Sequence, residues 1–368
     1  MKVREKHYRS LWADESQGVV HIIDQARLPH VFETATIASA EAMAEAIRGM
    51  RVRGAPLIGV AAAYGIALAV ARDPSDESIS KASALLRTTR PTAVNLAWGI
   101  GRMRERLAAV KLSERLVIAW NEAQAIADED VALNEGIGRH GLELLEREYA
   151  ARKRPINVLT HCNAGWIATV DWGTVTAPIF MAHDRGIPVH VWVDETRPRN
   201  QGLLTAWELA GHGVPHTLVT DNAGGHLMQR GMVDLVLVGA DRVTRRGDVC
   251  NKIGTYLKAV AARANNIPFY AAVPTPTIDW GIEDALREIP IEERAEDEVR
   301  IVRGLDSEGR FAEVTIAPRT TRVANPAFDV TPAEYVTAII TEKGVARATE
   351  TELLAFWPRS KQSKAYLT

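Results

Sequence analysis

The stretch VDLVLVGAD, residues 233–241, decides how the second half of this chain folds. After one early aspartate it runs through Leu and Val without a polar residue at every second position. It then ends in a glycine, an alanine and a carboxylate. Strands buried on both faces of a parallel sheet have this continuous apolar texture. We therefore expect a strand at residues 233–239, with Asp241 emerging at the border of a buried sheet.

Four more short β-rich runs have the same texture: INVLT at 156–160, VHVWV at 189–193, TLVT at 217–220 and FYAAV at 269–273. Segments between them, such as LLTAWELAGHG, AGGHLMQRG and KIGTYLKAVAARANN, can form helices. Parallel strands need such crossover connections. The pattern predicts an α/β protein with a Rossmann-like parallel sheet over residues 155–345, closed by a final helix over 331–344.

The first part of the chain has a different pattern. It opens with one candidate strand in VVHIIDQ, residues 19–25, and then has Ala- and Leu-rich segments with apolar residues three and four apart. These segments predict helices at 39–50, 55–72, 77–89, 93–110 and 115–145. We expect a smaller, mainly helical N-terminal domain at 1–145, a charged linker at 145–155 and a C-terminal tail at 346–368.

Composition narrows the class of protein. The 368 residues are 46% hydrophobic and 24% charged, as in ordinary globular proteins, and the net charge of -2 disfavours nucleic acid or an anionic membrane as partner. We expect no apolar run to approach the roughly 18 residues needed to span a bilayer. The N-terminus lacks the apolar core of a signal peptide. Two cysteines suit a reducing compartment. We expect a cytoplasmic enzyme or binding protein.

Polar or small residues follow each predicted strand. The clusters are His161-Cys162-Asn163, Asp194-Glu195-Thr196-Arg197, Asp221-Asn222, Ala240-Asp241-Arg242 and Pro274-Thr275. In open α/β sheets, ligands bind outside the carboxyl ends of the strands, where loops and helix N-termini converge. The five clusters therefore predict the place of a ligand site, although they do not identify a reaction.

Cys162 is a candidate for a reactive thiol. A lone cysteine is more often a small buried hydrophobe. However, Cys162 stands at a strand end near a helix start, where amides and the helix dipole can stabilise a thiolate. Its neighbour His161 points to the opposite face of the strand and is expected to support the core or the next loop. Cys250 is expected to be structural. Without a CxxC or HxxxH pattern, we expect no metal.

Asp241 is a candidate general acid. A carboxyl group at the border of a buried sheet has a raised pKa and can stay protonated near neutral pH, as a general acid must. The alternative is that Asp241 pairs with Arg242 or caps a turn.

Two stretches are suited to an anion. Arg53, Gly54 and Ala55 directly precede Pro56, a favoured first residue of a helix, and free amides at such a helix start bind phosphate. Asn251 and Lys252 precede a second predicted helix. Each stretch alone could be ordinary capping, but together they favour a small phosphorylated ligand. Neither matches the nucleotide-binding patterns GxxxxGK[ST] or GxGxxG.

Seven motifs together resemble one enzyme family. They are RGAPLIGVAAAYG, RPTAVNLAW, LTHCNAGWIAT, VDETRPRNQG with LTAWEL, TDNAGG, VGADRVTRRGDVCNKIGTY and FYAAVPTPTID, in order along the chain. They are similar to the S-methyl-5-thioribose-1-phosphate isomerases of methionine salvage. The wider family also holds ribose-1,5-bisphosphate isomerases and regulatory subunits of the guanine-nucleotide exchange factor for translation initiation, which share the fold without the catalytic pair.

The resemblance implies roles for nine residues. Cys162 and Asp241 would be the catalytic pair. The residues Arg53, Gly54, Ala55, Arg90, Gln201, Asn251 and Lys252 would bind the sugar phosphate. The resemblance also implies a helical N-terminal domain before a Rossmann-like domain, a homodimer, and neither a metal nor an organic cofactor.

The implied reaction converts 5-methylthioribose 1-phosphate to 5-methylthioribulose 1-phosphate. Because C1 carries a phosphate ester, the ring cannot open through a free anomeric hydroxyl, and an acid such as Asp241 is needed. Hydrogen then moves from C2 to C1, either as a proton taken by a Cys162 thiolate or as a direct hydride shift in an apolar pocket.

Three other functions stay open. The chain has one residue fewer than the family pattern after Gln201-Gly202, so an isomerase of another 5-substituted ribose 1-phosphate would also fit. The substrate could then be 5-deoxyribose 1-phosphate or ribose 1,5-bisphosphate. A thiol-dependent hydrolase or transferase using Cys162 is a second alternative. A non-catalytic subunit that senses a sugar phosphate is the third, and the presence of both Cys162 and Asp241 argues against it.

Overall fold

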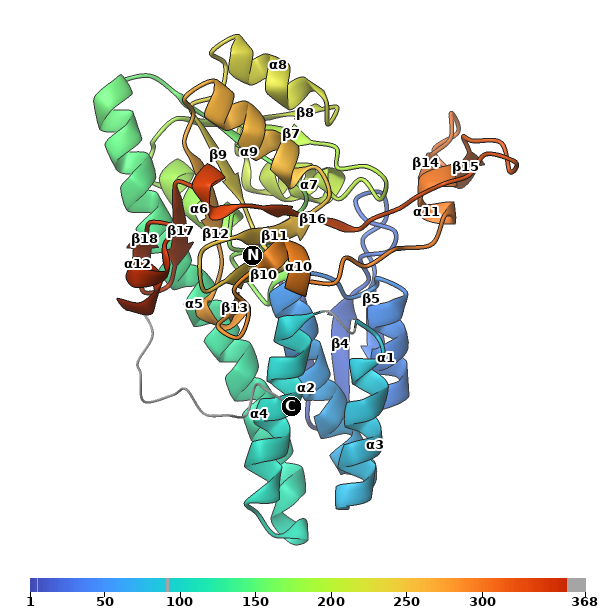
Figure 1. Cartoon of the computed structure of the whole chain (residues 1–368). Helices are drawn as coiled ribbons and strands as arrows, with labels where there is room; N and C mark the ends of the chain where they lie inside the picture. The colour runs from blue at the N-terminus through green and yellow to red at the C-terminus, as the bar shows by residue number, and fades with distance from the viewer. Residues whose placement is uncertain (5, 91–92, 356–368) are drawn as a thin grey trace.

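Seven strands form the central sheet of the second half of the chain, in the order β18-β17-β12-β9-β6-β7-β8 (Figure 1). The computed structural model describes residues 1–4, 6–90 and 93–355. The strands are β6 (Ile156–Thr160), β7 (Val189–Asp194), β8 (His216–Val219), β9 (Leu235–Val238), β12 (Phe269–Ala272), β17 (Ala338–Thr341) and β18 (Gly344–Ala346). All except β18 pair in parallel. Counted along the chain, the parallel strands follow the order 3-2-1-4-5-6, so the predicted Rossmann-like fold is confirmed.

Helices cover both faces of this sheet. They are α5 (Arg115–Arg152), α6 (Thr176–Asp184), α7 (Gly202–His212), α8 (Ala223–Gln229) and α9 (Thr255–Ala264). Alternate strand residues point to opposite faces, so that Val158 packs with residues of α5, α6 and α7 while Leu159 packs with residues of α8 and α9. Burial on both faces explains why the strands were recognisable as continuous apolar runs.

The N-terminal part is a helical layer with small sheets beside it. Its elements are β1 (Lys2–Val3), β2 (Lys6–His7), β3 (Leu11–Asp14), β4 (Val19–Ile23), β5 (Thr34–Ile37), α1 (Ala40–Arg48), α2 (Ala55–Arg72), α3 (Asp76–Arg87), α4 (Val94–Ala108) and η1 (Leu112–Glu114). The predicted helices and the strand in VVHIIDQ are confirmed, but β4 also pairs with β3 and β5, which were not predicted.

The predicted linker at 145–155 is wrong for most of its length. Helix α5 runs through to Arg152, and Lys153 ends it in a left-handed conformation. Its last turns are good helix formers, and Arg152 pairs with Glu148 one turn earlier. In Figure 1 this long helix passes beside both the N-terminal helices and the sheet, so it joins the two parts rather than separating them.

Helix α2 corrects the expectation that no apolar run is long enough to span a bilayer. By length and composition alone, Ala55–Arg72 passes that test. However, 78% of the helix is buried inside the protein. Its side chains pack against α1, α3, α4 and α5, which makes it the central helix of the N-terminal layer.

A second, smaller sheet was not predicted. It has the order β13-β10-β11-β16, formed by β13 (Ile278–Asp279), β10 (Arg242–Thr244), β11 (Val249–Lys252) and β16 (Phe328–Thr331). The segment before β16 contains α10 (Ala285–Glu288), α11 (Asp297–Arg300) and the hairpin of β14 (Ile301–Leu305) and β15 (Phe311–Thr315), which projects from the body in Figure 1. Strands of two to five residues carry little periodic signal.

The predicted final helix over 331–344 is wrong. The segment instead ends β16, forms the 3₁₀ turn η4 (Ala333–Tyr335) and supplies β17 and the start of β18. All four residues of β17 are buried, and a short run of this kind cannot be assigned to helix or strand by its periodicity. The expected tail contains α12 (Glu350–Ala355), and residues 356–368 lie outside the described residues.

Close contact between α2 and α4 depends on glycine. A Cβ at Gly99 of α4 would lie 2.3 Å from the carbonyl oxygen of Gly59 in α2, whereas a Cβ at Gly101, also in α4, would meet nothing within 4 Å. We predict that Gly99→Ala lowers the free energy of unfolding by about 1–3 kcal/mol, because the helices must move apart. The matched variant Gly101→Ala should be neutral or stabilising by up to about 1 kcal/mol. Urea unfolding measures both, and equal effects would contradict this packing.

Candidate active site

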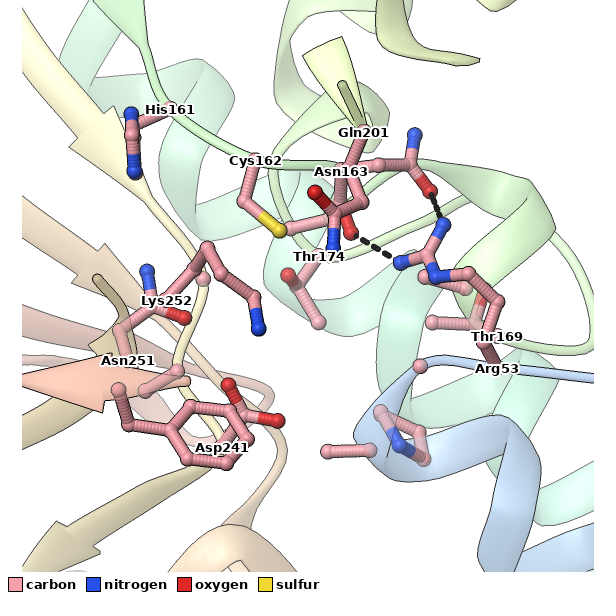
Figure 2. A pocket seen from close by; sticks show the side chains of 18 of the residues that line it. Arg53, His161, Cys162, Asn163, Thr169, Thr174, Gln201, Asp241, Asn251 and Lys252 are labelled. Carbon is pink, nitrogen blue, oxygen red and sulfur yellow. Dashed lines mark hydrogen bonds between the residues drawn. The ribbon is translucent and has the colours of Figure 1, made fainter. Parts of the chain in front are cut away.

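A pocket opens at the point where the strand order reverses. Cys162 follows β6 and Asp241 follows β9, which are the neighbouring strands at that point. All nine predicted residues line this pocket: Arg53, Gly54, Ala55, Arg90, Cys162, Gln201, Asp241, Asn251 and Lys252. Figure 2 shows side chains from both parts of the chain pointing into it. The space between the lining atoms is about 660 Å³ when the open mouth is included.

The backbone at Cys162 is strained in a way that aims its side chain. Its φ of 68° lies in the left-handed region, which costs a non-glycine residue about 1–3 kcal/mol. Two threonines hold this conformation: the amide of Cys162 donates to Thr196 Oγ1 over 2.8 Å, and its carbonyl accepts from Thr205 Oγ1 over 2.8 Å. In Figure 2 the sulfur points into the pocket towards Lys252.

Burial and neighbouring charges oppose each other at the thiol. Burial raises the pKa of Cys162, and the cations of Arg53 and Lys252 only partly offset this rise. Burial likewise lowers the pKa of Lys252, which the nearby Cys162 and Asp241 would raise. The site therefore holds Cys162 mainly as a thiol at neutral pH.

Asp241 has the environment predicted for a general acid. Burial raises the pKa of its carboxyl group, with Lys252, Arg90 and Arg53 acting in the opposite direction. Its backbone amide donates to the carbonyl of Cys250 over 3.0 Å, which fixes it beside β11. The side chain of Arg242, which the sequence offered as an alternative partner of Asp241, places its Nη1 3.4 Å from Asp279 Oδ2. Figure 2 shows the Asp241 carboxylate directed into the pocket.

The start of α2 forms one wall of the pocket. Gly54 is its N-cap, with φ of 104° and no side-chain cap, so the first amides of the helix are free to bind an anion. The guanidinium of Arg53 is held beside them by hydrogen bonds to Asn163 Oδ1 at 2.7 Å and to the Asn163 carbonyl at 2.9 Å.

Glu208 on α7 supports this wall from behind. Its carboxylate accepts from Asn163 Nδ2 at 2.8 Å and from the Ile167 amide at 2.7 Å. Burial raises the pKa of Glu208 to about 7. Asn163 is thereby fixed between a buried carboxyl group and Arg53, which orients the guanidinium.

The remaining predicted residues, Lys252, Arg90, Asn251 and Gln201, also line the pocket. Lys252 Nζ lies over the ring of Phe328, 4.5 Å from the ring centroid. The guanidinium of Arg90 lies over the same ring, and its Nε is 3.3 Å from Glu292 Oε2. Asn251 donates to Thr255 Oγ1 over 3.1 Å. Gln201 is buried, and its Oε1 has no hydrogen-bond partner among the described residues, so it can accept from a ligand hydroxyl.

Other lining residues were not singled out as site residues. Asn163 and His161 stood in the cluster after the first strand, so their position was a usable signal. Met50, Thr169, Thr174 and Phe328 also line the pocket, but nothing in their local sequence distinguishes them.

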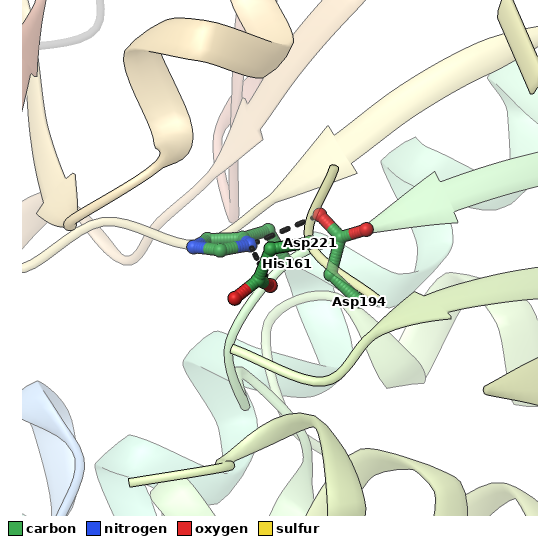
Figure 3. Close-up of side chains that lie close together, drawn as sticks. All are labelled: His161, Asp194 and Asp221. Carbon is green, nitrogen blue, oxygen red and sulfur yellow. Dashed lines mark hydrogen bonds and ion pairs between the residues drawn. The ribbon is translucent and has the colours of Figure 1, made fainter. Parts of the chain in front are cut away.

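His161, Asp194 and Asp221 form the group that could hold a metal among the described residues (Figure 3). Their ligand atoms lie within 4.8 Å of one another. However, the ammonium of Lys258 lies 3.1 Å from Asp194 Oδ2 and already supplies a cation to this carboxylate. The donor set therefore fits a network of ion pairs better than a metal site.

Comparison with known proteins identifies the family. Residues 51–348 match the model of the initiation factor 2 subunit family, and the chain belongs to this family. Proteins named methylthioribose-1-phosphate isomerase are similar along the whole chain: that of Gluconobacter oxydans (strain 621H) is 58% identical, with 100% of both chains covered. That of Escherichia coli O45:K1 is 57% identical over 96% of this chain and 95% of the relative.

Solved structures that are similar to this chain point to the same family. The 5-methylthioribose 1-phosphate isomerase of Pyrococcus horikoshii OT3 superposes with a TM-score of 0.81 at 41% identity, covering 95% of this chain and 96% of that one. A protein described as translation initiation factor eIF-2B, subunit delta, from A. fulgidus has a TM-score of 0.77 at 41% identity, covering 95% and 100%.

The electrostatics of Cys162 give a testable prediction. Because burial raises the pKa of Cys162, its alkylation by iodoacetamide should be slower at pH 8 than that of free cysteine and should rise with pH. Lys252→Met removes a cation that lowers this pKa, so less thiolate is present and the rate should fall by a further factor of about three to ten. Mass spectrometry follows the adduct, with Lys81→Met on the exposed side of α3 as control. Rapid alkylation of Cys162 at pH 7 would contradict the assignment.

Proposed function

We propose that this protein is an aldose-ketose isomerase of methionine salvage, which converts 5-methylthioribose 1-phosphate to 5-methylthioribulose 1-phosphate. One observation supports this most strongly: the nine residues that the sequence predicts for the site come from widely separated segments and line a single pocket. The name of the relatives that match along the whole chain agrees with it.

The pocket has the charge that a sugar phosphate needs. Three cationic side chains, Arg53, Arg90 and Lys252, line it together with the free amides of α2. Arg90 is balanced by Glu292, which leaves Arg53 and Lys252 to receive an anion. We place the phosphate between the start of α2 and Lys252.

Ring opening is the first chemical step. Protonated Asp241 donates its proton to the ring oxygen while the bond between C1 and that oxygen breaks, and the C1 phosphate oxygen stabilises the resulting cation. The raised pKa of Asp241 keeps the acid form available near neutral pH. The negative charge of the substrate phosphate would offset the positive charges of Lys252 and Arg53, so these two side chains would lower the pKa of Asp241 less when substrate is bound.

Hydrogen then moves from C2 to C1. A protonated thiol cannot accept the C2 proton, so the raised pKa of Cys162 favours the direct shift of hydride. The electron pair moves with the hydrogen to C1, and C2 becomes the carbonyl carbon after its hydroxyl proton returns to Asp241. In this scheme Cys162 contacts C1 and C2 and keeps water away from the cation.

The non-catalytic alternative is less well supported. A sensing subunit needs the phosphate cradle but no acid, and both Cys162 and Asp241 point into the pocket (Figure 2). A thiol hydrolase needs a base beside Cys162, whereas His161 Nδ1 and Nε2 are both occupied, by Asp194 and by the Ile253 carbonyl. As a further part of the proposal, we expect a cytoplasmic homodimer.

The function is tested by incubation with 5-methylthioribose 1-phosphate while NMR follows the ketose. Rapid conversion is expected, with 5-deoxyribose 1-phosphate and ribose 1,5-bisphosphate converted more slowly. Deuterium placed at C2 should appear at C1 of the product. Phosphate binding without turnover of any of the three sugars would refute the proposal.

Substitution of the pair gives a sharper prediction. Asp241→Asn should lower kcat by about 10²–10⁴-fold, the usual contribution of a positioned acid. Cys162→Ser should also lower kcat at least about tenfold, because a hydroxyl group in place of the thiol holds water beside the cation. Binding of inorganic phosphate, measured by calorimetry, should stay close to that of the unaltered protein. In the unaltered protein kcat should fall as pH rises through the raised pKa of Asp241, because the acid form is lost. Cys250→Ala is the control and should stay active; full activity of either pair variant would contradict the roles.

A further inference from the structure

His161 directly precedes Cys162 but has hydrogen-bond partners of its own on the far side from the thiol. It is 1% exposed. Its Nδ1 lies 3.0 Å from Asp194 Oδ2 and 3.9 Å from Asp221 Oδ1, and its Nε2 lies 2.8 Å from the carbonyl oxygen of Ile253 (Figure 3). Both ring nitrogens therefore face oxygen atoms.

The partner atoms determine where protons must be. A backbone carbonyl can only accept, so Nε2 must carry hydrogen. On the other side, either Nδ1 carries hydrogen or Asp194 Oδ2 does. The Lys258 ammonium lies 3.1 Å from that same oxygen, which opposes a proton on it. A proton on Asp194 Oδ1 would be unpaired, since this buried atom has no partner among the described residues.

The charges around the ring also favour hydrogen on both ring nitrogens, that is, an imidazolium. Three carboxyl groups surround it: Asp194 at the end of β7, Asp221 after β8, and Asp329 of β16. Burial raises the pKa of Asp329, while hydrogen bonds from the Gly254 and Tyr256 amides and the nearby His161 act against this rise. Lys258 of α9 is the cation that pairs with this group. If the ring were neutral, Lys258 would be the one positive charge named here beside three carboxyl groups. An imidazolium ring supplies a second positive charge.

The ring also joins the two halves of the pocket. Ile253 directly follows Lys252, so the hydrogen bond from Nε2 holds the Lys252 loop against the Cys162 loop. A Cβ at Gly254 would lie 3.1 Å from His161 Cε1, which shows how closely this loop packs on the ring. Asp221 in turn accepts from the Thr196 amide, and Thr196 Oγ1 accepts from the Cys162 amide.

We propose that His161 is a charged positioning residue: as an imidazolium that donates to Asp194 and to Ile253, it fixes the Cys162 thiol relative to the Lys252 ammonium. This goes beyond support of the core, and its effect on turnover rests on the proposed isomerase function. Both ring nitrogens of His161 are already paired, with Asp194 and the Ile253 carbonyl, and so are not available to bind the sugar; loss of His161 should therefore change kcat more than KM.

The protonation state is tested on the unaltered protein. Long-range ¹H–¹⁵N NMR of the histidine rings at pH 7.5 should show one ring with hydrogen on both nitrogens, and this signal should be absent from His161→Gln. A neutral ring with one hydrogen at His161 would overturn the proposal. This measurement needs no turnover, so it stands apart from the test of the proposed function.

The positioning role is tested by two variants. His161→Gln keeps a donor near Ile253 and His161→Asn keeps one near Asp194, but neither carries the charge. Each should lower kcat at least tenfold with less than a threefold change in KM. His226→Gln, on the exposed side of α8, should match the unaltered protein. A kcat equal to that of the unaltered protein in either folded variant would overturn the positioning role of His161. If neither variant folds, the NMR measurement decides whether His161 carries the charge on which the proposal depends.

Discussion

The reversal of strand order between β6 and β9 is the constraint on which the site depends. Successive parallel strands add to one side of β6 and then, from β9 onwards, to the other, so the loops that follow these two strands separate and leave a crevice. Cys162 and Asp241 occupy these two loops. Their separation along the chain is therefore no obstacle to a shared site, because adjacent strands bring their carboxyl ends together.

The N-terminal layer completes the crevice through one close backbone contact. A Cβ at Gly54 would lie 2.3 Å from the carbonyl oxygen of Ala168, so only glycine lets the start of α2 approach this closely. The approach places Arg53 on Asn163 and the free amides of α2 over the pocket. Burial then raises the pKa of Cys162 and Asp241 and lowers that of Lys252. Charges fixed before the substrate arrives need little rearrangement during the reaction, which is how enzymes stabilise a transition state electrostatically.

Five of the seven strands of the central sheet could be predicted from the sequence because each left a local mark, and so could the positions of Cys162 and Asp241. Arg90 and Gln201 left no such mark, and only the family resemblance pointed to them. Buried parallel strands are continuous apolar runs, and the polar residue after each run marks its carboxyl end. The small second sheet left no such mark, since its strands have two to four residues. The segment of β17 was mistaken for helix because its short buried run fits either structure. Glu208 lies within the apolar pattern of α7, and only the fold reveals that it reaches Asn163. Contacts between distant segments are set by packing, which a single sequence does not display.

The most direct test of the central claim is a crystal structure of the Asp241→Asn variant with 5-methylthioribose 1-phosphate bound. The account predicts the phosphate at the start of α2, with Cys162 Sγ and the side chain at position 241 both within about 4 Å of the same sugar ring. A sugar bound outside the crevice between β6 and β9, or one within reach of only one of these two side chains, would contradict it.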